Sequence, residues 1–355
     1  GFAYSSRLRK CQLIQNMKIF KTNLHDKDIQ IISRVLTSGE LGFGPNVSLF
    51  EREFASFSQK KYNVATNSAS ASAFMIFSFL KDMYGECDVY TTSLGFASPA
   101  WAAKHFGHNL IFVDVDDELQ FSVKDYKKQR QARCERYTDG GITPVIMPVL
   151  YGGVSNIDGF DSFFDNSSYE EIVVVDAAHC VTPTIKSDFV FFSFHPYKPI
   201  CTSDGGMIST NNPRANDYFR SYRNFGREPS GHSYDIKQTG FKFYMNNLNA
   251  TIGLTQIERY EDNLNIRKKN YDRLLDDFGG YLMPHDNKSS FYFATTLTID
   301  ANDVILNNRL ARHYPMLHTT SYFRNGQELP NLELLHSAIV NLPLWTEVKL
   351  KLTER

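Results

Sequence analysis

A lysine follows a stretch so hydrophobic that a charged side chain beside it needs a reason. The stretch is FVFFSFH (189–195), and Lys198 comes three residues after it. An amine in an apolar environment has a lowered pKa, and its neutral form can attack a carbonyl carbon to form a Schiff base. The alternative is a lysine whose stem packs on apolar surface while its ammonium group reaches water.

Two further groups favour the Schiff-base interpretation. Asp176 ends the apolar run EIVVVD, which places a carboxylate at the carboxyl edge of a buried strand, where open parallel sheets bind ligands. The small residues of TNSASASAF (66–74) lead into a helix and can present free backbone N–H groups to an anion, although an ordinary helix cap is the alternative. Pyridoxal phosphate requires this set: an amine for its aldehyde carbon, a carboxylate for its ring nitrogen and an anion site for its phosphate.

The elements that must position these groups form an alternating pattern of strands and helices. Short apolar runs without polar alternation predict strands that are covered on both faces. Their alternation with helical patterns predicts an α/β fold with a mostly parallel sheet and right-handed crossovers. The predicted strands are YNVAT (62–66), DVYTTSL (88–94), LIFVDVD (110–116), TPVIMPVLY (143–151), EIVVVDAAH (171–179), FVFFSFH (189–195) and GMIST (206–210).

The character of the chain changes near residue 245. A long helical pattern leads there into a smaller α/β segment with strands near 290–299. We therefore predict a large cofactor-binding domain over residues 17–245, and a long helix with a small C-terminal domain over 246–355. Residues 1–16 precede Met17 and lack the hydrophobic region of a signal peptide, which indicates a leader or an added segment, with a native extension as the alternative.

Composition narrows the class of protein. The chain has 355 residues, of which 42% are hydrophobic and 22% charged, and its formal net charge is -1. These values are typical of a globular protein and disfavour nucleic-acid binding. Five widely spaced cysteines without a CxxC pair argue against a disulfide framework or zinc site and for a cytoplasmic setting. No apolar run is long enough to span a bilayer, and no GxGxxG follows the first strand as a plain nucleotide-binding domain would require.

Seven segments of the chain carry recognisable motifs, namely LTSGELGFGPNVSLFEREFASF (36–57), TNSASASAF (66–74), TTSLGFASPAWAAKHFGHNLIFVDVD (91–116), LYGGVSNID (150–158), VVVDAAHC (173–180), SFHPYK (193–198) and TGFKFYMNNLNATIGLTQIE (239–258). In this order they resemble the motifs of the DegT/DnrJ/EryC1/StrS family of pyridoxal-phosphate-dependent sugar aminotransferases. The resemblance runs from about Lys18 to about Leu344, and it implies fold type I, the aspartate aminotransferase-like fold with a large seven-stranded, mostly parallel sheet domain and a smaller C-terminal α/β domain. Each motif alone is a weak signal, and their shared order makes the match specific.

The resemblance implies catalytic roles at matching positions. Lys198 would form the Schiff base and move a proton between the substrate α-carbon and the cofactor. Asp176 would pair with the ring nitrogen, and His179 would lie near the cofactor's phenolic oxygen. His318, in YPMLH, is a predicted sugar contact. The alternatives are a satisfied core histidine for His179 and a surface histidine for His318.

The resemblance also implies a cofactor-binding set. Phe96 would stack on the ring, and Ser193, Ala69 and Ser70 would hold the phosphate. Lys242 would reach that phosphate from the partner subunit of a homodimer with shared active sites. The alternatives are plain core packing for Phe96 and a hydroxyl bonded to backbone for Ser193.

Several positions depart from the family pattern. Ala69 stands where the family usually has glycine, so it lacks glycine's freedom to adopt positive φ. Val149 stands where many members have histidine, and Tyr244 replaces an arginine or asparagine. We also expect a shortened link between DAAHC and SFHPYK and a missing or shortened last helix. These departures bear on substrate identity more than on cofactor chemistry.

The implied reaction transfers an amino group from L-glutamate to a keto group of a nucleotide-linked deoxysugar. The DAAH and SFHxxK variants, with RNFG (223–226), are most similar to the subgroup that acts on dTDP-4-keto-6-deoxyglucose, for cell-surface polysaccharide or related amino-sugar biosynthesis. One alternative is a pyridoxal-phosphate-dependent sugar dehydratase, although that branch carries histidine in place of Lys198. Another is a cofactor-binding but non-catalytic regulatory or scaffold protein, because a fold does not establish a function.

Overall fold

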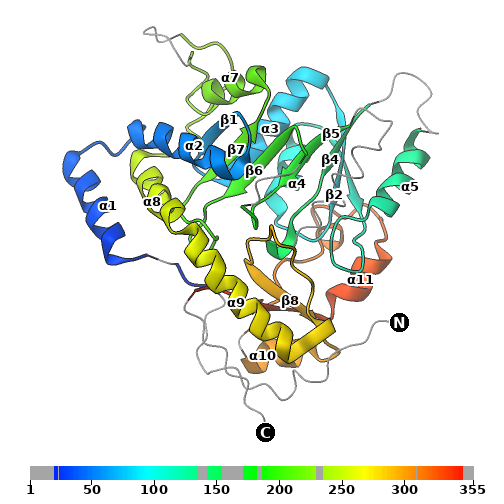
Figure 1. The fold of residues 1–355 in the computed structure, drawn as a ribbon. Coiled ribbons are helices and arrows are strands. Elements are labelled where there is room, and N and C mark those ends of the chain that lie inside the picture. The colour runs from blue at the N-terminus through cyan, green and yellow to red at the C-terminus, as the bar shows by residue number, and fades with distance from the viewer. Residues whose placement is uncertain are drawn as a thin grey trace.

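A seven-stranded sheet forms the centre of the molecule (Figure 1). The structure is a computed structural model, and it describes residues 20–22, 24–134, 142–153, 171–181, 186–228, 235–308 and 310–346. The strand order is β1-β7-β6-β5-β4-β2-β3, and only β7 runs antiparallel to its neighbours, so the predicted mostly parallel sheet is confirmed. The strands are β1 (Tyr62–Thr66), β2 (Cys87–Thr92), β3 (Asn109–Val113), β4 (Thr143–Met147), β5 (Ile172–Asp176), β6 (Phe189–Ser193) and β7 (Gly206–Thr210).

Helices cover both faces of this sheet because successive side chains of each strand point to opposite sides. Phe191 and Phe192 illustrate this alternation. Phe191 packs in an apolar layer with α3 (Ala69–Tyr84), and Phe192 packs in a second layer with α2 (Pro45–Ser58) and α8 (Asn247–Glu258). Both phenylalanines are almost completely buried, which explains why β6 reads as a continuous apolar run. The helices of this part are α1 (Asp26–Ser38), α2 (Pro45–Ser58), α3 (Ala69–Tyr84), α4 (Ala97–His105), α5 (Val123–Cys134) and α7 (Pro213–Tyr222).

The predicted single long helix after residue 245 is two helices. α8 (Asn247–Glu258) and α9 (Tyr260–Phe278) meet at Arg259, whose backbone leaves the helical conformation. The Arg259 guanidinium donates two hydrogen bonds of 2.6 Å to the buried Asp28 carboxylate of α1. This bidentate ion pair fixes the break against α1, a contact across more than 200 residues that helical periodicity cannot predict.

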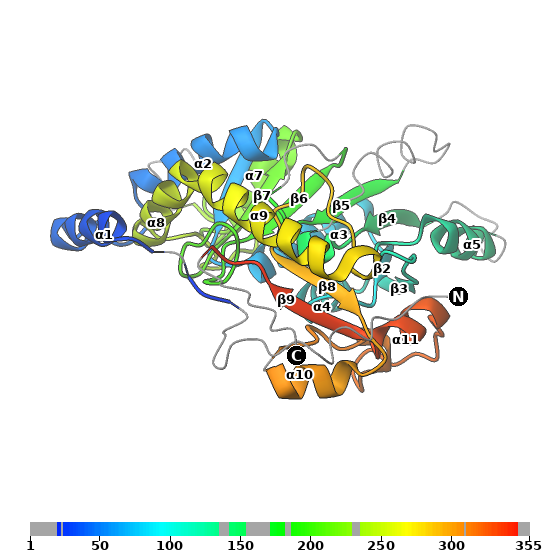
Figure 2. The same cartoon turned by 60° about the horizontal axis from the view of Figure 1, so that its bottom comes forward.

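The C-terminal part builds a small two-stranded antiparallel sheet that lies beneath α9 (Figure 2). β8 (Phe293–Leu297) lies where strands were predicted, whereas β9 (Ile339–Pro343) was not predicted as a strand. α10 (Ala301–Asn308) and α11 (Pro330–His336) complete this part. One apolar cluster joins Phe112 of β3 to Phe293 and Leu332, so the two parts share buried surface, and the domain boundary near residue 245 stays a prediction.

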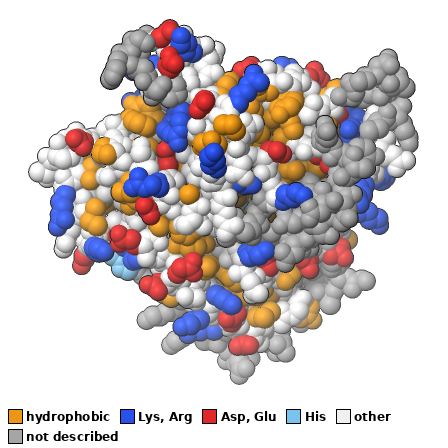
Figure 3. Space-filling model, turned by 45° about the horizontal axis from the view of Figure 1, so that its top comes forward, with side chains coloured by type: hydrophobic (Ala, Val, Ile, Leu, Met, Phe, Trp, Pro, Cys, Tyr) orange, Lys and Arg blue, Asp and Glu red, His pale blue; other side chains and the backbone are white. Residues whose placement is uncertain are grey.

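Several predictions fall outside the described residues. These are the leader over 1–16, the second half of LYGGVSNID, part of the shortened link before β6, and the end of the chain. None of the helices that the structure describes is both long and apolar enough to cross a membrane. On the face shown in Figure 3, basic and acidic side chains are interspersed with apolar ones, in keeping with the near-zero net charge.

Candidate active site

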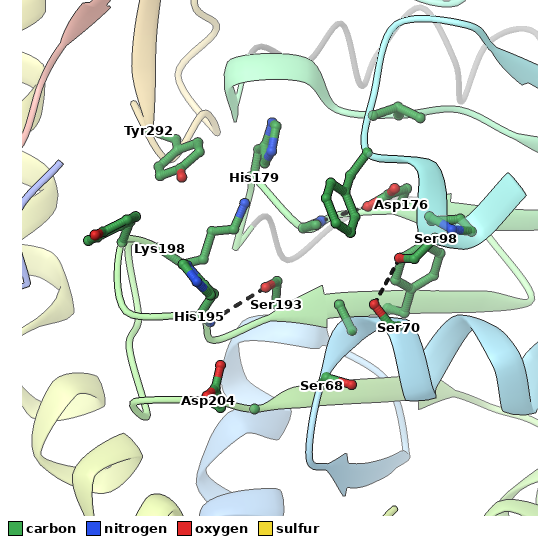
Figure 4. Close-up of a pocket in the computed structure, with 18 of the residues that line it drawn as sticks. Ser68, Ser70, Ser98, Asp176, His179, Ser193, His195, Lys198, Asp204 and Tyr292 are labelled. Carbon is green, nitrogen blue, oxygen red and sulfur yellow. Dashed lines mark hydrogen bonds between the residues drawn. The ribbon is translucent and has the colours of Figure 1, made fainter. Parts of the chain in front are cut away.

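A cavity of about 410 Å³ opens beyond the carboxyl ends of β5 and β6 (Figure 4). The N-termini of α3 and α4 supply its opposite wall, and the C-terminal part of the chain closes one side. The cavity brings together seven of the nine residues predicted from the sequence to form the site. These are Lys198, Asp176, His179, Ser193, Ala69, Ser70 and Phe96.

Lys198 and Asp176 are two ionisable residues of opposite charge that line the same cavity. Lys198 lies in the turn after β6, where its backbone N–H donates to the His195 carbonyl at 2.9 Å, and its side chain extends into the cavity (Figure 4). Asp176 is the last residue of β5 and is 3% exposed. One of its oxygens accepts a hydrogen bond of 3.0 Å from the Ala178 N–H.

Burial moves the pKa values of both groups toward neutrality. It raises the pKa of Asp176 to about 6, because removal from water penalises the carboxylate, and the nearby Lys198 ammonium opposes this effect only in part. It lowers the pKa of Lys198 to about 7 for the same reason, again with partial opposition from Asp176. Lys198 Nζ also lies 4.5 Å from the centre of the Tyr292 ring. A substantial fraction of Lys198 is therefore a neutral amine at neutral pH, as a nucleophilic lysine needs.

His179 is buried beside these groups and has both ring nitrogens engaged. The Gly152 N–H donates to Nδ1 at 3.1 Å, and Nε2 lies 3.0 Å from the Tyr314 hydroxyl. Burial, with the nearby Lys198 charge, holds the pKa of His179 well below its usual range, so the ring is neutral. His179 is buried and both of its ring nitrogens are hydrogen-bonded, as the alternative of a core histidine predicts. Its side chain also lines the cavity.

The opposite end of the cavity is built to receive an anion. α3 begins at Ala69 after the N-cap Ser68, whose side chain accepts a hydrogen bond from the Ala71 N–H. The first N–H groups of a helix have no partner inside the helix, and they carry partial positive charge. Ser70 Oγ contributes a hydroxyl here and donates to Ser98 Oγ at 2.9 Å. Ala69 does not adopt positive φ, so the change from the family's glycine needs no special backbone conformation.

The approach of β7 to this turn is unusually close. A side chain at Gly206 would place its Cβ 2.5 Å from the Ser68 carbonyl carbon and 2.6 Å from the Ala69 nitrogen. Because glycine has no side chain, β7 can pack directly against the backbone at the start of α3. The anion-binding turn is held by backbone contact and not by long side chains.

Aromatic and apolar side chains shape the remaining walls. Phe96 is the N-cap residue of α4 and is 56% exposed, so it is available to a planar ligand and is not plain core. Val149 lies on the cavity wall, where it provides an apolar surface in place of the polar group found in many family members. Ser193 Oγ, at the end of β6, accepts a long hydrogen bond of 3.5 Å from the His195 backbone N–H, which leaves the hydroxyl able to bind a ligand as well.

Two predicted residues lie outside this cavity. Lys242 is exposed and lines a separate hollow with Leu41 and Tyr244, in keeping with a residue that would serve a partner's site, a role that stays a prediction. His318 is buried, where its ring contacts Ser93 Oγ at 2.7 Å and a Glu333 carboxylate oxygen at 3.1 Å. The alternative of a surface histidine is therefore wrong, and the described contacts of His318 offer no support for a sugar-binding role.

Sequence reasoning missed several residues that line the cavity. Tyr314 is the most informative, because it is the first residue of the same YPMLH segment from which His318 was selected. Tyr292, Tyr197 and Ser98 also line the cavity. Only Ser98 had a usable signal, since it follows Phe96 at a predicted helix start, whereas the tyrosines enter from turns and from the C-terminal part.

The residues present fit pyridoxal phosphate by their chemistry. Asp176 is a buried carboxylate without an ion-pair partner among the described residues, and a protonated ring nitrogen would supply one. Lys198 supplies the amine, and the start of α3 supplies unpaired N–H groups for a phosphate. Phe96, which lines the same cavity, offers an exposed aromatic face. The geometry therefore meets the cofactor's three chemical requirements in one cavity.

Comparison with known proteins agrees with this site. The family model of the DegT/DnrJ/EryC1/StrS aminotransferases matches residues 22–355. The spore coat polysaccharide biosynthesis protein SpsC of Bacillus subtilis is 29% identical over 299 residues, covering 77% of this chain and 73% of that protein. Among solved structures, the Helicobacter pylori aminotransferase PseC superimposes with a TM-score of 0.81 at 20% identity, covering 94% of this chain and 95% of that one.

A further solved structure shares this fold. The sugar aminotransferase Spr1654 of Streptococcus pneumoniae has a TM-score of 0.80 at 24% identity, covers 94% of each chain, and is known in forms with pyridoxal and with pyridoxamine phosphate. These likenesses establish the shared fold, and the family match covers almost all of the chain. The chain belongs to the DegT/DnrJ/EryC1/StrS aminotransferase family, and it is a pyridoxal-phosphate-dependent aminotransferase.

Proposed function

We propose that this enzyme transfers the amino group of L-glutamate to the keto group of a nucleotide-linked 4-keto-6-deoxysugar, with dTDP as the nucleotide. The reaction would take place in the cytoplasm and supply an amino sugar for a cell-surface polysaccharide. The observation that carries the proposal is the meeting of Lys198 and Asp176 in one cavity with the anion-binding start of α3. The name of the relative SpsC, a spore coat polysaccharide biosynthesis protein, supports the class of product. The buried thiols of Cys87 and Cys201, which form no disulfide in the part of the chain that the structure describes, support a reducing compartment.

Each group of this chain would contribute a separate task. Lys198, as a neutral amine, would hold the cofactor through its aldehyde carbon. Once the amine of the substrate has displaced it from that carbon, the released Lys198 amine would accept and return the proton of the substrate carbon, because it reaches into the cavity and its pKa lies near 7. Asp176 would hold a proton on the ring nitrogen, which suits a buried carboxylate that lacks another cation among the described residues. When bound, the cofactor supplies an electron sink for the cleavage of bonds at the amino-bearing carbon. Phe96 and Val149 would exclude water from the reacting atoms.

The departures from the family pattern leave the catalytic groups intact. Val149 makes the cavity wall apolar where others are polar, so it would affect the fit of the sugar more than the chemistry at Lys198. The dehydratase alternative requires a residue other than lysine at position 198. The non-catalytic alternative predicts that an amino donor leaves the bound cofactor unchanged.

A homodimer with shared sites forms part of the proposal. Around Lys242 lie four apolar side chains with exposed fractions between 40% and 51%, namely Leu41, Phe43, Phe225 and Phe241. Phe43 packs edge-on against Tyr244, and the hollow beside it is lined by Leu41 and Lys242. An exposed apolar patch around a lysine suits an interface that would bring this lysine to a phosphate of the other subunit.

The test is a half-reaction on the purified protein supplied with pyridoxal phosphate. The visible spectrum is recorded, excess L-glutamate is added, and the measurement is repeated with Lys198→Ala and with Lys268→Ala, an exposed lysine of α9. We expect conversion of the cofactor to its amine form in the wild type and in Lys268→Ala, and none in Lys198→Ala. Return of the visible band on addition of dTDP-4-keto-6-deoxyglucose would identify the acceptor. A cofactor that binds but responds to no amino donor would favour the regulatory alternative.

A further inference from the structure

Tyr314 enters the cavity from the C-terminal part of the chain and contacts the residues that surround the proposed cofactor ring. Its hydroxyl lies 3.0 Å from His179 Nε2, a contact across 135 residues of sequence. Its ring packs edge-on against Phe96, with 6.2 Å between centroids. The negative charge of Asp176 is also close enough to affect the hydroxyl of Tyr314.

The hydrogen bonds around His179 have only one possible direction. The Gly152 N–H donates to Nδ1, so Nδ1 must carry a lone pair. The ring is neutral, and its single proton therefore sits on Nε2 and is donated to the Tyr314 oxygen. His179 consequently has no ring nitrogen left to offer a ligand.

The chain of donors ends at the Tyr314 hydroxyl. Its oxygen accepts from His179, and its own proton has no acceptor among the residues that the structure describes. Tyr314 is half-buried on the cavity wall, so a phenol proton without a protein acceptor is available for donation to a bound ligand. Because Tyr314 lines the cavity, that ligand must be one that the cavity binds.

The backbone of Tyr314 is held in an uncommon conformation that keeps this side chain in place. Its φ is 72°, in the left-handed region that few non-glycine residues adopt. His336 Nε2 lies 3.1 Å from the Tyr314 carbonyl oxygen and so fixes the turn from outside the cavity. Strained backbone of this kind is concentrated at functional sites, where the surrounding structure maintains it.

We propose that Tyr314, and not His179, donates the hydrogen bond from this wall to an oxygen of the bound cofactor or substrate, and that His179 acts as its positioning residue. This inference rests on the proposed function, and it transfers to Tyr314 the contact that the family resemblance assigns to His179. The acceptor is an oxygen that is a phenolate or a carbonyl. Two sources offer such an oxygen, namely the phenolic oxygen of the cofactor and the keto oxygen of the sugar.

The test compares Tyr314→Phe with Tyr151→Phe. The first variant keeps the ring and removes only the hydroxyl. The second removes the hydroxyl of Tyr151, a buried neighbour whose ring centroid lies 6.4 Å from that of Tyr314. The Tyr151 hydroxyl bonds to Asn341, and Tyr151 does not line the cavity. Both are titrated with pyridoxal phosphate, and the dissociation constant, the visible spectrum and the rates of the glutamate and keto-sugar half-reactions are recorded.

Two outcomes support the proposal and separate the sources of the oxygen. If the cofactor supplies it, Tyr314→Phe weakens cofactor binding by about tenfold or more and shifts the visible band before any substrate is added. If the sugar supplies it, binding, spectrum and the glutamate half-reaction stay at wild-type values, and only the keto-sugar half-reaction slows by about tenfold or more. Tyr151→Phe should leave all of these readouts unchanged.

Other outcomes overturn the proposal. Wild-type values of every readout for Tyr314→Phe would overturn it. Equal losses in the two variants would also overturn it, because they would indicate an effect on packing and not the loss of one hydrogen bond. Failure of the wild-type protein to bind the cofactor would instead overturn the proposed function, and this inference with it. If Tyr314→Phe does not fold, two structures of the unaltered protein decide the point, one with pyridoxal phosphate and one with the amine form of the cofactor and the keto-sugar. Tyr314 Oη must then lie within hydrogen-bond distance of a ligand oxygen in at least one of them. A direct bond from His179 Nε2 to that oxygen would contradict the proposal.

Discussion

Asp176 and Lys198 face one cavity from the ends of adjacent parallel strands, and no ion pair joins them in the part of the chain that the structure describes. Asp176 is buried and Lys198 is half-buried, and loss of solvation shifts the pKa of each toward its neutral form, while the charge of each opposes this shift in the other. This separation leaves room for a planar group between a carboxylate and an amine. It also makes the stability of the cofactor-free protein depend on pH in a specific way.

Asp176 and Lys198 should contribute least to the free energy of unfolding of the cofactor-free protein near pH 6.5. Because the pKa of Asp176 is raised from 3.8 to about 6, the folded state binds the extra proton between these values, and stability falls as the pH rises through them. Because the pKa of Lys198 is lowered from 10.5 to about 7, the unfolded state binds the extra proton above pH 7, and stability rises again. Relative to an Asp176→Asn/Lys198→Met double variant, we expect a gain of about 2–3 kcal/mol between pH 6.5 and 9.

Urea denaturation of both proteins without cofactor at pH 4.5, 6.5 and 9 measures this difference. Subtracting the double variant removes the contribution of titrating groups that neither side chain affects, and the histidines near Lys198 are outside that set. A difference that is largest at pH 6.5 would mean that the two side chains form an ion pair in the folded state, contrary to this prediction.

Gly206→Ala should weaken cofactor binding by displacing the anion-binding turn. The new methyl group would meet backbone atoms of Ser68 and Ala69 at about 2.5 Å, and backbone cannot move aside as a flexible side chain can. We expect a loss of about tenfold or more in pyridoxal phosphate affinity and a loss of about 1–3 kcal/mol in the free energy of unfolding. Gly280→Ala is the matched control, since its φ is not positive and its new methyl group would have no described atom within 4 Å. Unchanged affinity in Gly206→Ala would show that the turn does not contact the phosphate.

Glu51→Gln should strongly destabilise the protein without acting at the cavity. Glu51 is buried and receives hydrogen bonds from the guanidinium groups of Arg223 and Arg220 and from the Ala65 N–H. Loss of its charge leaves the buried Arg223 without its counter-ion, which costs about 3–5 kcal/mol. Arg223 is the first residue of RNFG, the segment whose sequence resembles one sugar-specific subgroup. In the part of the chain that the structure describes, the Arg223 guanidinium bonds to Glu51 and to the Ala65 carbonyl and does not line the cavity.

The control for this prediction is Glu53→Gln on the same helix. Glu53 pairs with Arg52 in solvent, with both side chains at least 50% exposed, and such pairs contribute about 0–1 kcal/mol. Chemical denaturation of the two variants should therefore separate them by at least about 2 kcal/mol. Equal stabilities would mean that Arg223 finds another partner.

Mixing two inactive variants should restore activity if the sites are shared between subunits. Lys198→Ala lacks the amine, and Lys242→Ala lacks the lysine that we propose reaches the other subunit's phosphate. In a random mixture, half of the dimers are mixed and each contains one complete site, so we expect about a quarter of wild-type activity after co-refolding. No recovery, with Lys242→Ala inactive alone, would place Lys242 in its own subunit's site.

Much of the site could be predicted because it lies on strands and helix starts that the sequence marks locally. The apolar runs that end at Asp176 and precede Lys198 form β5 and β6, and parallel pairing brings their carboxyl ends to one edge. The small residues after β1 predict the start of α3, which the structure has at Ala69. These features depend on residues within a few positions of one another, and they were therefore predictable.

Other parts depended on contacts between distant segments. The break at Arg259 depends on Asp28, and the choice between Tyr314 and His318 within YPMLH depends on which of them the C-terminal part turns toward His179. The sequence alone determined the family and the cofactor, because motif order along the chain encodes them, and it predicts Lys198 as the reacting lysine. Only the tertiary structure decided that both ring nitrogens of His179 form hydrogen bonds, one with Gly152 and one with Tyr314. The contact with Tyr314 spans 135 residues, so it follows from packing and not from spacing along the chain.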